Sequence, residues 1–292
     1  MAVVNTNVIA SVAQNALAKN ERAMNTAMER LSTGQRINAA KDDAAGLAIA
    51  SRMTSQIRGL DMAIRNANDA ISMISTADGA MIEVTNMLQR MRELALQSAN
   101  GTTTSADRSY LNDEYQNLIT EIERIAQNTQ WNGRNILQGD ANAPSDSTVN
   151  FQVGANGGQT VGVSFGDISQ SGGAAFQTFE ISAAGAGSFI TAGTTASALT
   201  TASAALTKID SAITAVNTQR ATFGAAMNQL TYAVDNLASV RVNAEASRSR
   251  IMDTDYAVET SELARTQIIQ QAGTAMLAQA NQLPQTVLSL IQ

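Results

Sequence analysis

The chain has 292 residues, and 44% of them are hydrophobic, so it can bury a substantial core. It contains no Cys and no His, which excludes thiolate and imidazole metal ligands, most nucleophile and base arrangements of enzymes and any His pH switch. We therefore expect a protein that is not an enzyme and has no cofactor or metal. The formal net charge of -6 offers no basic surface to a nucleic-acid backbone, so we expect no nucleic-acid partner either.

The kind of apolar residue favours long helices. Aromatic residues make up only 4% of the chain, so Ala, Leu, Ile, Val and Met carry the hydrophobic count. Compact globular cores use large rings, whereas helices that pack side by side are built from these aliphatic residues. The 12 Met residues fit as flexible filler along such helix seams.

Near the N-terminus an apolar residue recurs at every seventh position. The positions are Val3, Ala10, Leu17, Met24 and Leu31. This period keeps one stripe of a helix facing a partner helix. The segment lacks the basic start, continuous apolar core and cleavage site of a secretory signal. No stretch of the chain reaches the roughly 18 apolar residues that span a bilayer, so we expect no membrane insertion and a different route if the protein is exported.

A second heptad stripe begins at Met53 and predicts a helix from about 44 to 98. It continues through Leu60, Ala67, Ile74, Met81, Leu88 and Ala95. None of these positions is polar, which indicates a continuous packed seam. Asn100 and Gly101 then predict a helix stop and a turn. A shorter helix is predicted from about 105 to 130, with Ser105 as its N-cap.

The composition changes between 137 and 207. This segment holds 11 of the 19 Gly residues, and no Lys or Arg occurs from 135 to 207. Two short alternating runs, 149–153 and 161–165, flank Asn156, Gly157 and Gly158 and predict a β-hairpin. The Gly, Ala, Ser and Thr tract from 182 to 201 predicts a surface loop.

The last third of the chain returns to the heptad period. A long stripe steps through Ile209, Val216, Phe223, Leu230, Leu237, Ala244 and Ile251, and a terminal one through Ile269, Met276, Leu283 and Leu290. The two long stripes can bury each other only if the first and last thirds run antiparallel. Pro284 is expected to end or kink the last helix at about Leu283.

Together these patterns predict a mainly α fold, a long antiparallel helical bundle or coiled-coil rod formed by the N- and C-terminal segments, with a small insert that contains a β-hairpin. The expected divisions are 1–43, 44–140, 141–205, 206–253 and 254–292. Thirteen of the heptad residues are expected to pack between helices and subunits. They are Leu17, Met24, Leu31, Met53, Leu60, Ile74, Leu88, Leu230, Leu237, Ile269, Met276, Leu283 and Leu290.

Three segments carry a specific resemblance: ERLSTGQRINAAKDDAAGLAIASRM (29–53), LQRMRELALQSANGT (88–102) and ANQLPQTVLSLIQ (280–292). They resemble segments of bacterial flagellin in their sequence, their order and their position in the chain, and the resemblance covers about the first 140 and last 90 residues. The middle is too short for the large outer domains of long flagellins, so the chain resembles a minimal form.

The resemblance implies a subunit of the extracellular flagellar filament used for swimming, which self-assembles into a helical homopolymer and is exported unfolded by the flagellar type III apparatus. Segments 1–43 and 254–292 would form the inner core of the filament, and 44–140 with 206–253 the outer core. Expected partners are an export chaperone, the filament cap and the hook-junction proteins. Lys41, Asp42 and Asp43 would lie at the joint between the two layers and contact neighbouring subunits.

Host immune receptors for flagellin are a further partner that the resemblance implies. Gln89, Arg90, Leu94 and Glu114 match positions that animal flagellin-sensing Toll-like receptors bind. Segment 29–50 resembles the epitope of plant flagellin receptors. The physical alternative for Arg90 is an exposed charged strip with weak intrahelical pairs.

Three other functions remain open from the sequence. A flagellar hook-filament junction protein would share the terminal helices but not the full LSTGQRINAAKDDAAGLAIA segment. A secreted type III helical translocator would show heptads without self-assembly. An enzyme that uses carboxylates alone, such as a glycosidase, would need a pair of acidic residues in a cleft, and no such context is visible.

Overall fold

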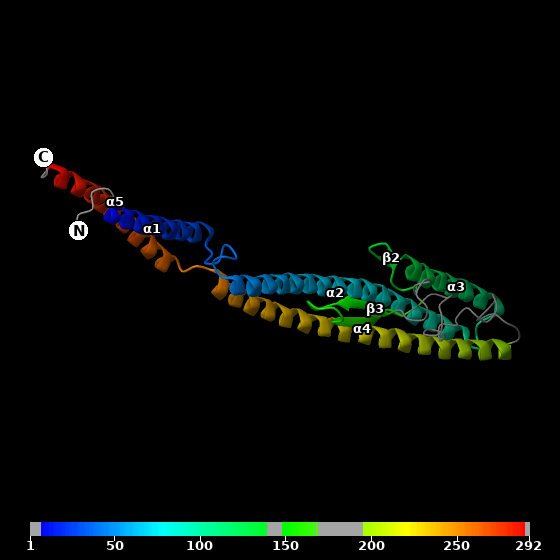
Figure 1. Ribbon diagram of the computed structural model, residues 1–292. Coiled ribbons are helices and arrows are strands. Elements are labelled where there is room, and N and C mark those ends of the chain that lie inside the picture. Colours follow the sequence, from blue (N-terminus) through cyan, green and yellow to red (C-terminus); the bar gives the residue numbers. More distant parts are fainter. Residues whose placement is uncertain (1–6, 139–147, 167, 169–194, 290–292) are drawn as a thin grey trace. The chain divides into compact units, whose positions relative to one another are not determined.

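The computed structural model describes residues 7–138, 148–166, 168 and 195–289, with side chains outside 195–200 and 283–289. The chain divides into two compact units. Arg58–Val240 forms one, the central unit, and Met1–Ile57 with Arg241–Gln292 forms the other, the terminal unit. Helices α2 (Ala44–Ser98) and α4 (Thr195–Met252) contribute residues to both, and the mainly helical class is confirmed (Figure 1).

The central unit is built on one apolar core between α2, α4 and α3 (Ser105–Asn128). Every heptad position of α2 from Leu60 to Ala95 is at most 4% exposed, and four of the heptad positions predicted on α4 are fully buried. Those four are Ile209, Val216, Phe223 and Leu230. The two predicted long stripes therefore face one core, as the seven-residue period requires.

Ion pairs at the edge of this core show the direction of the helices. Asp78 of α2 accepts from Arg220 of α4 at 2.8 Å, and Arg92 of α2 donates to Asp210 of α4 at 2.7 Å. Higher numbers on α2 meet lower numbers on α4, so the helices run antiparallel within the central unit, as predicted. The side chains are partly to largely exposed, and such pairs contribute less than about 1 kcal/mol each.

Helix α3 begins at Ser105, as the sequence predicts, but its N-cap is the residue before. Thr104, not Ser105, is the N-cap: its hydroxyl accepts from the backbone N–H of Asp107, and the Asp107 carboxylate accepts from the Thr104 N–H. This reciprocal pair is a capping box, which satisfies two donors that a helix start leaves free. Ser105 cannot form this pair, because the residue three positions after it is Arg108, whereas the residue three positions after Thr104 is the acidic Asp107.

A short hairpin after α3 was missed in the sequence. Strands β1 (Gln130–Trp131) and β2 (Arg134–Asn135) pair antiparallel around Asn132 and Gly133, which have φ values of 49° and 78°. Both residues adopt the left-handed conformation of a two-residue hairpin turn, for which Asn-Gly is the favoured dipeptide. The Asn-Gly dipeptide was visible in the sequence, but the predicted helix extended to about 130 and so included the first residue of β1.

The predicted hairpin of the insert is confirmed and lies against the core. Strands β3 (Thr148–Gln152) and β4 (Thr160–Ser164) pair antiparallel with Phe151 opposite Val161. Val163 is buried, and Phe165, which follows β4, stacks tilted on Phe223 of α4 with ring centroids 5.4 Å apart. One face of this insert is thus part of the core, not only surface. The tract 182–201 lies largely outside the described residues.

The terminal unit pairs α1 (Val8–Thr33) with α5 (Tyr256–Ser289). Three polar links join them: the Asn7 amide donates to the Ala280 carbonyl at 2.9 Å, Asn20 to the Thr266 carbonyl at 2.8 Å, and Arg30 to Glu259 at 2.8 Å. The residue number of the α5 partner falls as the number of the α1 residue rises, so the two ends of the chain pack antiparallel.

Pro284 does not end the last helix, so that part of the sequence prediction is wrong, and a kink at about Leu283 stays a prediction. Helix α5 continues to Ser289. Proline has no N–H, so in a helix the carbonyl four residues earlier, that of Ala280, loses its usual donor. Here the Asn7 side chain donates to that carbonyl instead. The lost backbone bond is replaced from the other end of the chain, which lowers the cost of the proline.

Candidate assembly surfaces

The predicted packing residues fall into two classes. Leu60, Ile74, Leu88 and Leu230 are buried inside the central unit, where they hold the chain's own helices together. Met53 and Leu237 are partly buried. The sequence placed all of them in one packing class, because a heptad stripe does not distinguish contacts within a chain from contacts between chains.

The terminal helices behave differently. Leu17, Met24 and Leu31 on α1 are partly buried, whereas Ile269 and Met276 on α5 are 40% and 65% exposed. Leu283 lies in α5 without a described side chain, and Leu290 lies outside the described residues. The stripe predicted on α5 therefore faces away from α1.

A different heptad set on α5 faces α1. Glu259, Thr266 and Ala280 are buried, and Gly273 lies at the same seven-residue spacing between the last two. A Cβ added at Gly273 would come within 2.6 Å of a Leu17 methyl group, so the glycine allows close approach. These positions are small or polar, and a search for large apolar residues overlooks them.

The outward residues of α1 and α5 form a conspicuous apolar set, which we call the terminal apolar surface. It consists of Val8, Ile9, Val12, Met28, Val258, Ile268, Ile269 and Met276. Each is at least 40% exposed. Soluble proteins expose single apolar side chains routinely, whereas a concentration of them on two paired helices is typical of an interaction surface.

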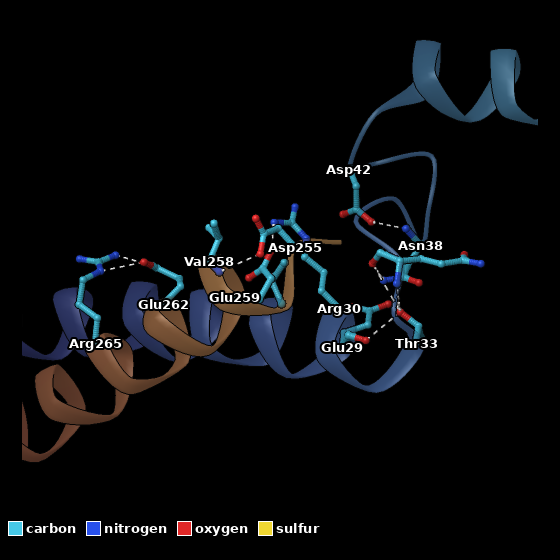
Figure 2. A network of polar contacts seen from close by, with 12 residues as sticks. Glu29, Arg30, Thr33, Asn38, Asp42, Asp255, Val258, Glu259, Glu262 and Arg265 are labelled. Carbon is cyan, nitrogen blue, oxygen red and sulfur yellow. Dashed lines mark hydrogen bonds and ion pairs between the residues drawn. The ribbon is translucent and has the colours of Figure 1, made fainter. Parts of the chain in front are cut away.

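The two chain connections in the terminal unit are held together by backbone contacts and lie beside the network of polar side chains drawn in Figure 2. Arg36 N–H donates to the Met252 carbonyl at 2.7 Å, and Thr254 N–H donates to the Gly34 carbonyl at 3.1 Å. The Arg30–Glu259 ion pair lies beside them, with the Glu259 side chain only 9% exposed. This arrangement fixes where α1 and α5 begin their pairing.

Gly34 is the residue that lets these connections meet. It ends α1 with a φ of 70°, and its N–H donates to the Arg30 carbonyl. A Cβ there would lie 2.9 Å from the Tyr256 hydroxyl oxygen. The left-handed conformation and the close neighbour both favour glycine.

The acidic pair before α2 serves the loop itself. Asp42 accepts from the backbone N–H groups of Asn38 and Ala39, and the Ala39 bond is the main cause that lowers the pKa of the carboxyl from its ordinary value. Asp43 accepts from the Gly46 N–H at 2.8 Å, at the start of α2. Contacts of this segment with neighbouring subunits remain a prediction.

The residues expected to meet host receptors divide between surface and core. Arg90 on α2 donates to Glu114 on α3 at 2.8 Å and to Glu93 at 2.9 Å, and these bonds raise the pKa of its guanidinium, chiefly through Glu114. Arg90, Glu114 and Gln89 are exposed. Leu94 is fully buried, so a partner of the folded chain cannot touch it directly.

One buried charge was not anticipated in the sequence. Arg108 on α3 is 4% exposed, and its guanidinium donates to the Ser98 carbonyl at 3.1 Å and the Asn100 carbonyl at 3.3 Å. These carbonyls lie at the end of α2, where helices leave acceptors free and carry partial negative charge. No local pattern distinguishes it from an exposed Arg.

Comparisons with known proteins agree with this architecture. Residues 4–142 match the family described as the bacterial flagellin N-terminal helical region, and residues 206–291 match the bacterial flagellin C-terminal helical region. Within the described residues, no helix combines the length and apolarity needed to cross a membrane.

Three related proteins illustrate the similarity. A flagellin of Halalkalibacterium halodurans is 44% identical, with 99% of this chain and 100% of that protein aligned. Flagellin A of Vibrio cholerae is 38% identical, with 99% of each chain aligned. A crystal structure of Bacillus cereus flagellin is 33% identical over 59% of this chain and 88% of that chain, with a TM-score of 0.46. The chain belongs to the bacterial flagellin family.

Proposed function

We infer that this chain is a structural, non-catalytic subunit that polymerises into the extracellular flagellar filament used for swimming. One observation carries the mechanism: α1 and α5 cover each other along one side and leave the terminal apolar surface in water. Copies of the same chain supply a matching cover, because every subunit presents the same heptad-patterned helices.

The central and terminal units differ in how much apolar surface the single chain already buries. Its heptad stripes are already buried against each other, so it keeps its fold without neighbours. The terminal unit has fewer buried apolar residues, and α1 buries only Asn20 and Ala27. Polymerisation then stabilises the ends by removing their apolar side chains from water, at about 25 cal/mol per Å².

Export and the remaining partners follow the family role. We propose that the chain leaves the cell unfolded through the flagellar type III apparatus, with an export chaperone on the way and with the hook-junction and cap proteins at the two ends of the filament. The family resemblance supports these partners. The absence of Cys also suits a chain that is threaded and then exposed outside the cell.

We further propose that Arg90, with Gln89 and Glu114, forms the face that an animal flagellin receptor binds. Arg90 offers a planar set of donors and already joins α2 to α3. Leu94 acts from inside, where it supports the helix beneath this face. Arg90→Ala should weaken receptor activation by the monomer about tenfold, whereas the exposed Arg124→Ala on α3 should not. Undiminished activation by the Arg90 variant at equal helicity would reject the contact.

Seeded polymerisation tests the main proposal. Filament fragments are added to the soluble chain, and polymer is measured by sedimentation and electron microscopy. Ile268→Glu should prevent polymerisation at unchanged helicity, because it places a charge in the terminal apolar surface. Gln271→Glu, an exposed position on the same helix, is the matched control and should still polymerise.

Two results would contradict the proposal. Failure of the unsubstituted chain to extend seeds would favour a secreted helical translocator. Normal filaments from Ile268→Glu would show that the terminal apolar surface is not the contact between copies.

A further inference from the structure

Helix α1 buries a polar side chain in its contact with α5. Of its residues only Asn20 and Ala27 are buried. The Asn20 amide donates to the Thr266 carbonyl at 2.8 Å and to the Gln270 side-chain oxygen at 3.1 Å. Thr266 is itself fully buried, and its hydroxyl is already used within α5. The amide therefore crosses between the helices at a place from which water is excluded.

The large apolar side chains along this seam do not by themselves define a single alignment. Leu17, Met24 and Leu31 repeat every seven residues on α1, and Leu263 and Leu277 lie fourteen residues apart on the facing side of α5. A shift of α5 by one heptad, about 10 Å along the axis, again places apolar side chains opposite one another. Flexible Leu and Met side chains adapt to such a shift at little cost.

Asn20 discriminates between these alignments. After a shift in one direction it faces Gly273 and Leu277, and after the opposite shift Glu259 and Leu263. Both shifts remove Gln270 as a partner. A buried amide that loses a partner is costly, whereas a Leu at the same place would be indifferent to the shift.

We propose that Asn20 is the positioning residue that fixes the register of α1 against α5. A single buried Asn in a helical seam selects one alignment at the expense of some stability. The Arg30–Glu259 and Asn7–Ala280 links lie toward the two ends of the pair, where Arg30 and Asn7 are only partly buried, so they reinforce this alignment. Asn20 holds it in the middle.

The register has a consequence for assembly, and this step rests on the proposed function. The terminal apolar surface is composed of residues from both helices. A one-heptad shift would move the α5 residues, such as Met276, about 10 Å relative to the α1 residues, such as Val12. A neighbouring copy that fits one alignment then fails to fit the other. Asn20 thereby sets the shape that the next subunit meets.

Cysteine cross-linking can measure the register, because the chain has no Cys of its own. Leu17→Cys is combined with Gly273→Cys for the observed alignment, and with Thr266→Cys or Ala280→Cys for the two shifted ones. Disulfide formation within the full chain is followed by gel mobility in soluble and sedimented fractions. Each pair is made in four backgrounds: unsubstituted, Asn20→Leu, Asn20→Ala, and the exposed control Asn25→Leu.

With Asn20 present, the aligned pair should cross-link at least about tenfold faster than either shifted pair, as one unpaired buried amide implies. In Asn20→Leu this advantage should fall below about threefold. The terminal helices of that variant should melt at the same or a higher temperature, which a merely structural role would not allow. Asn20→Ala should lose the advantage without the gain in stability, and Asn25→Leu should keep it.

An unchanged preference in both Asn20 variants would overturn the proposal, as would equal cross-linking of the three pairs in the unsubstituted chain. Seeded polymerisation of the chains without added Cys is measured separately. If the unsubstituted chain does not polymerise, the filament function fails, while the cross-linking ratios still decide the register.

Discussion

The central unit and the pair formed by α1 and α5 use the same heptad period for opposite purposes. In the central unit the large apolar residues at heptad positions are buried and the polar contacts lie at the edge, as with Asp78 and Arg220. In the α1–α5 pair, small and polar residues face inward and many large apolar residues face outward. The same period thus builds a core that is complete in the single chain and, under the proposed function, a helix pair whose outward surface other copies cover.

The largest expected effect tests whether the central core is complete in the monomer. Leu94→Ala removes a fully buried side chain and should lower the free energy of unfolding by about 2–5 kcal/mol. Leu96→Ala, on the exposed side of the same helix, should change it by less than about 0.5 kcal/mol. Both are measured by chemical denaturation of the soluble chain.

The same change in the terminal pair sharpens the contrast. Leu17→Ala should cost the soluble chain about 1 kcal/mol, because Leu17 is only partly buried there. The thermal stability of filaments should fall more, since neighbours would complete the burial. A monomer loss as large as that of Leu94→Ala would show that the terminal pair is as complete as the central core.

The long elements were predictable because their signals extend over many residues. A stripe such as Leu60 to Ala95 contains no polar interruption, and the alternating runs around Phe151 and Val161 identify a hairpin with one buried face. The limits of the helices were less certain. Thr104 required its partner Asp107 to be recognised as a cap, and Asn132-Gly133 required a turn to be given priority over a helix.

The inward face of α5 could not be found in the same way. Its members include Thr266, Gly273 and Ala280, which carry little hydrophobic signal, so the period of Ile269 and Met276 dominates the sequence. Long-range partners were equally hidden. Asn7 and Pro284 are separated by nearly the whole chain, and only the antiparallel pairing of the ends shows that one compensates for the other.

The next prediction concerns the stability that the buried charge of Arg108 contributes to the central unit. Arg108→Met should cost about 2 kcal/mol, because it removes the bonds of a buried guanidinium to the Ser98 and Asn100 carbonyls at the end of α2, which keep their contacts with Thr103. The matched change Arg124→Met affects a largely exposed ion pair with Glu121 on the same helix and should cost less than about 0.5 kcal/mol. Urea denaturation compares the two, and equal losses would mean that burial of Arg108 contributes nothing.

A double-mutant cycle tests the polar link between the two ends. Asn7→Asp keeps an acceptor for the Ala10 N–H but removes the donor to the Ala280 carbonyl. It should destabilise the terminal pair by about 1 kcal/mol in the natural chain, and by less when Pro284→Ala restores a backbone N–H to that carbonyl. Thermal melting of filaments provides the measurement. Additive effects of the two substitutions would refute the compensation.

The smallest effect concerns acid, to which the two regions should respond differently. In the central unit the Asp107 carboxylate accepts from the Thr104 hydroxyl at 2.7 Å and from its N–H at 3.1 Å, and the hydroxyl bond is the main cause that lowers the Asp107 pKa below its ordinary 3.8. A folded-state pKa below the unfolded one means that the stabilisation is present above pH 3.8 and is lost as the pH falls through the folded value.

The Asn7 and Asn20 amides that link α1 to α5 do not titrate, so their contribution should persist in that range. Thr104→Ala should flatten the acid dependence of central-unit unfolding below pH 3.8, whereas Ser105→Ala, next to the cap, should leave it unchanged. Thermal unfolding followed by circular dichroism from neutral to acid pH measures both variants. An acid dependence that persists in Thr104→Ala would assign the loss to other carboxylates, because the capping box is the contact that holds Asp107 ionised.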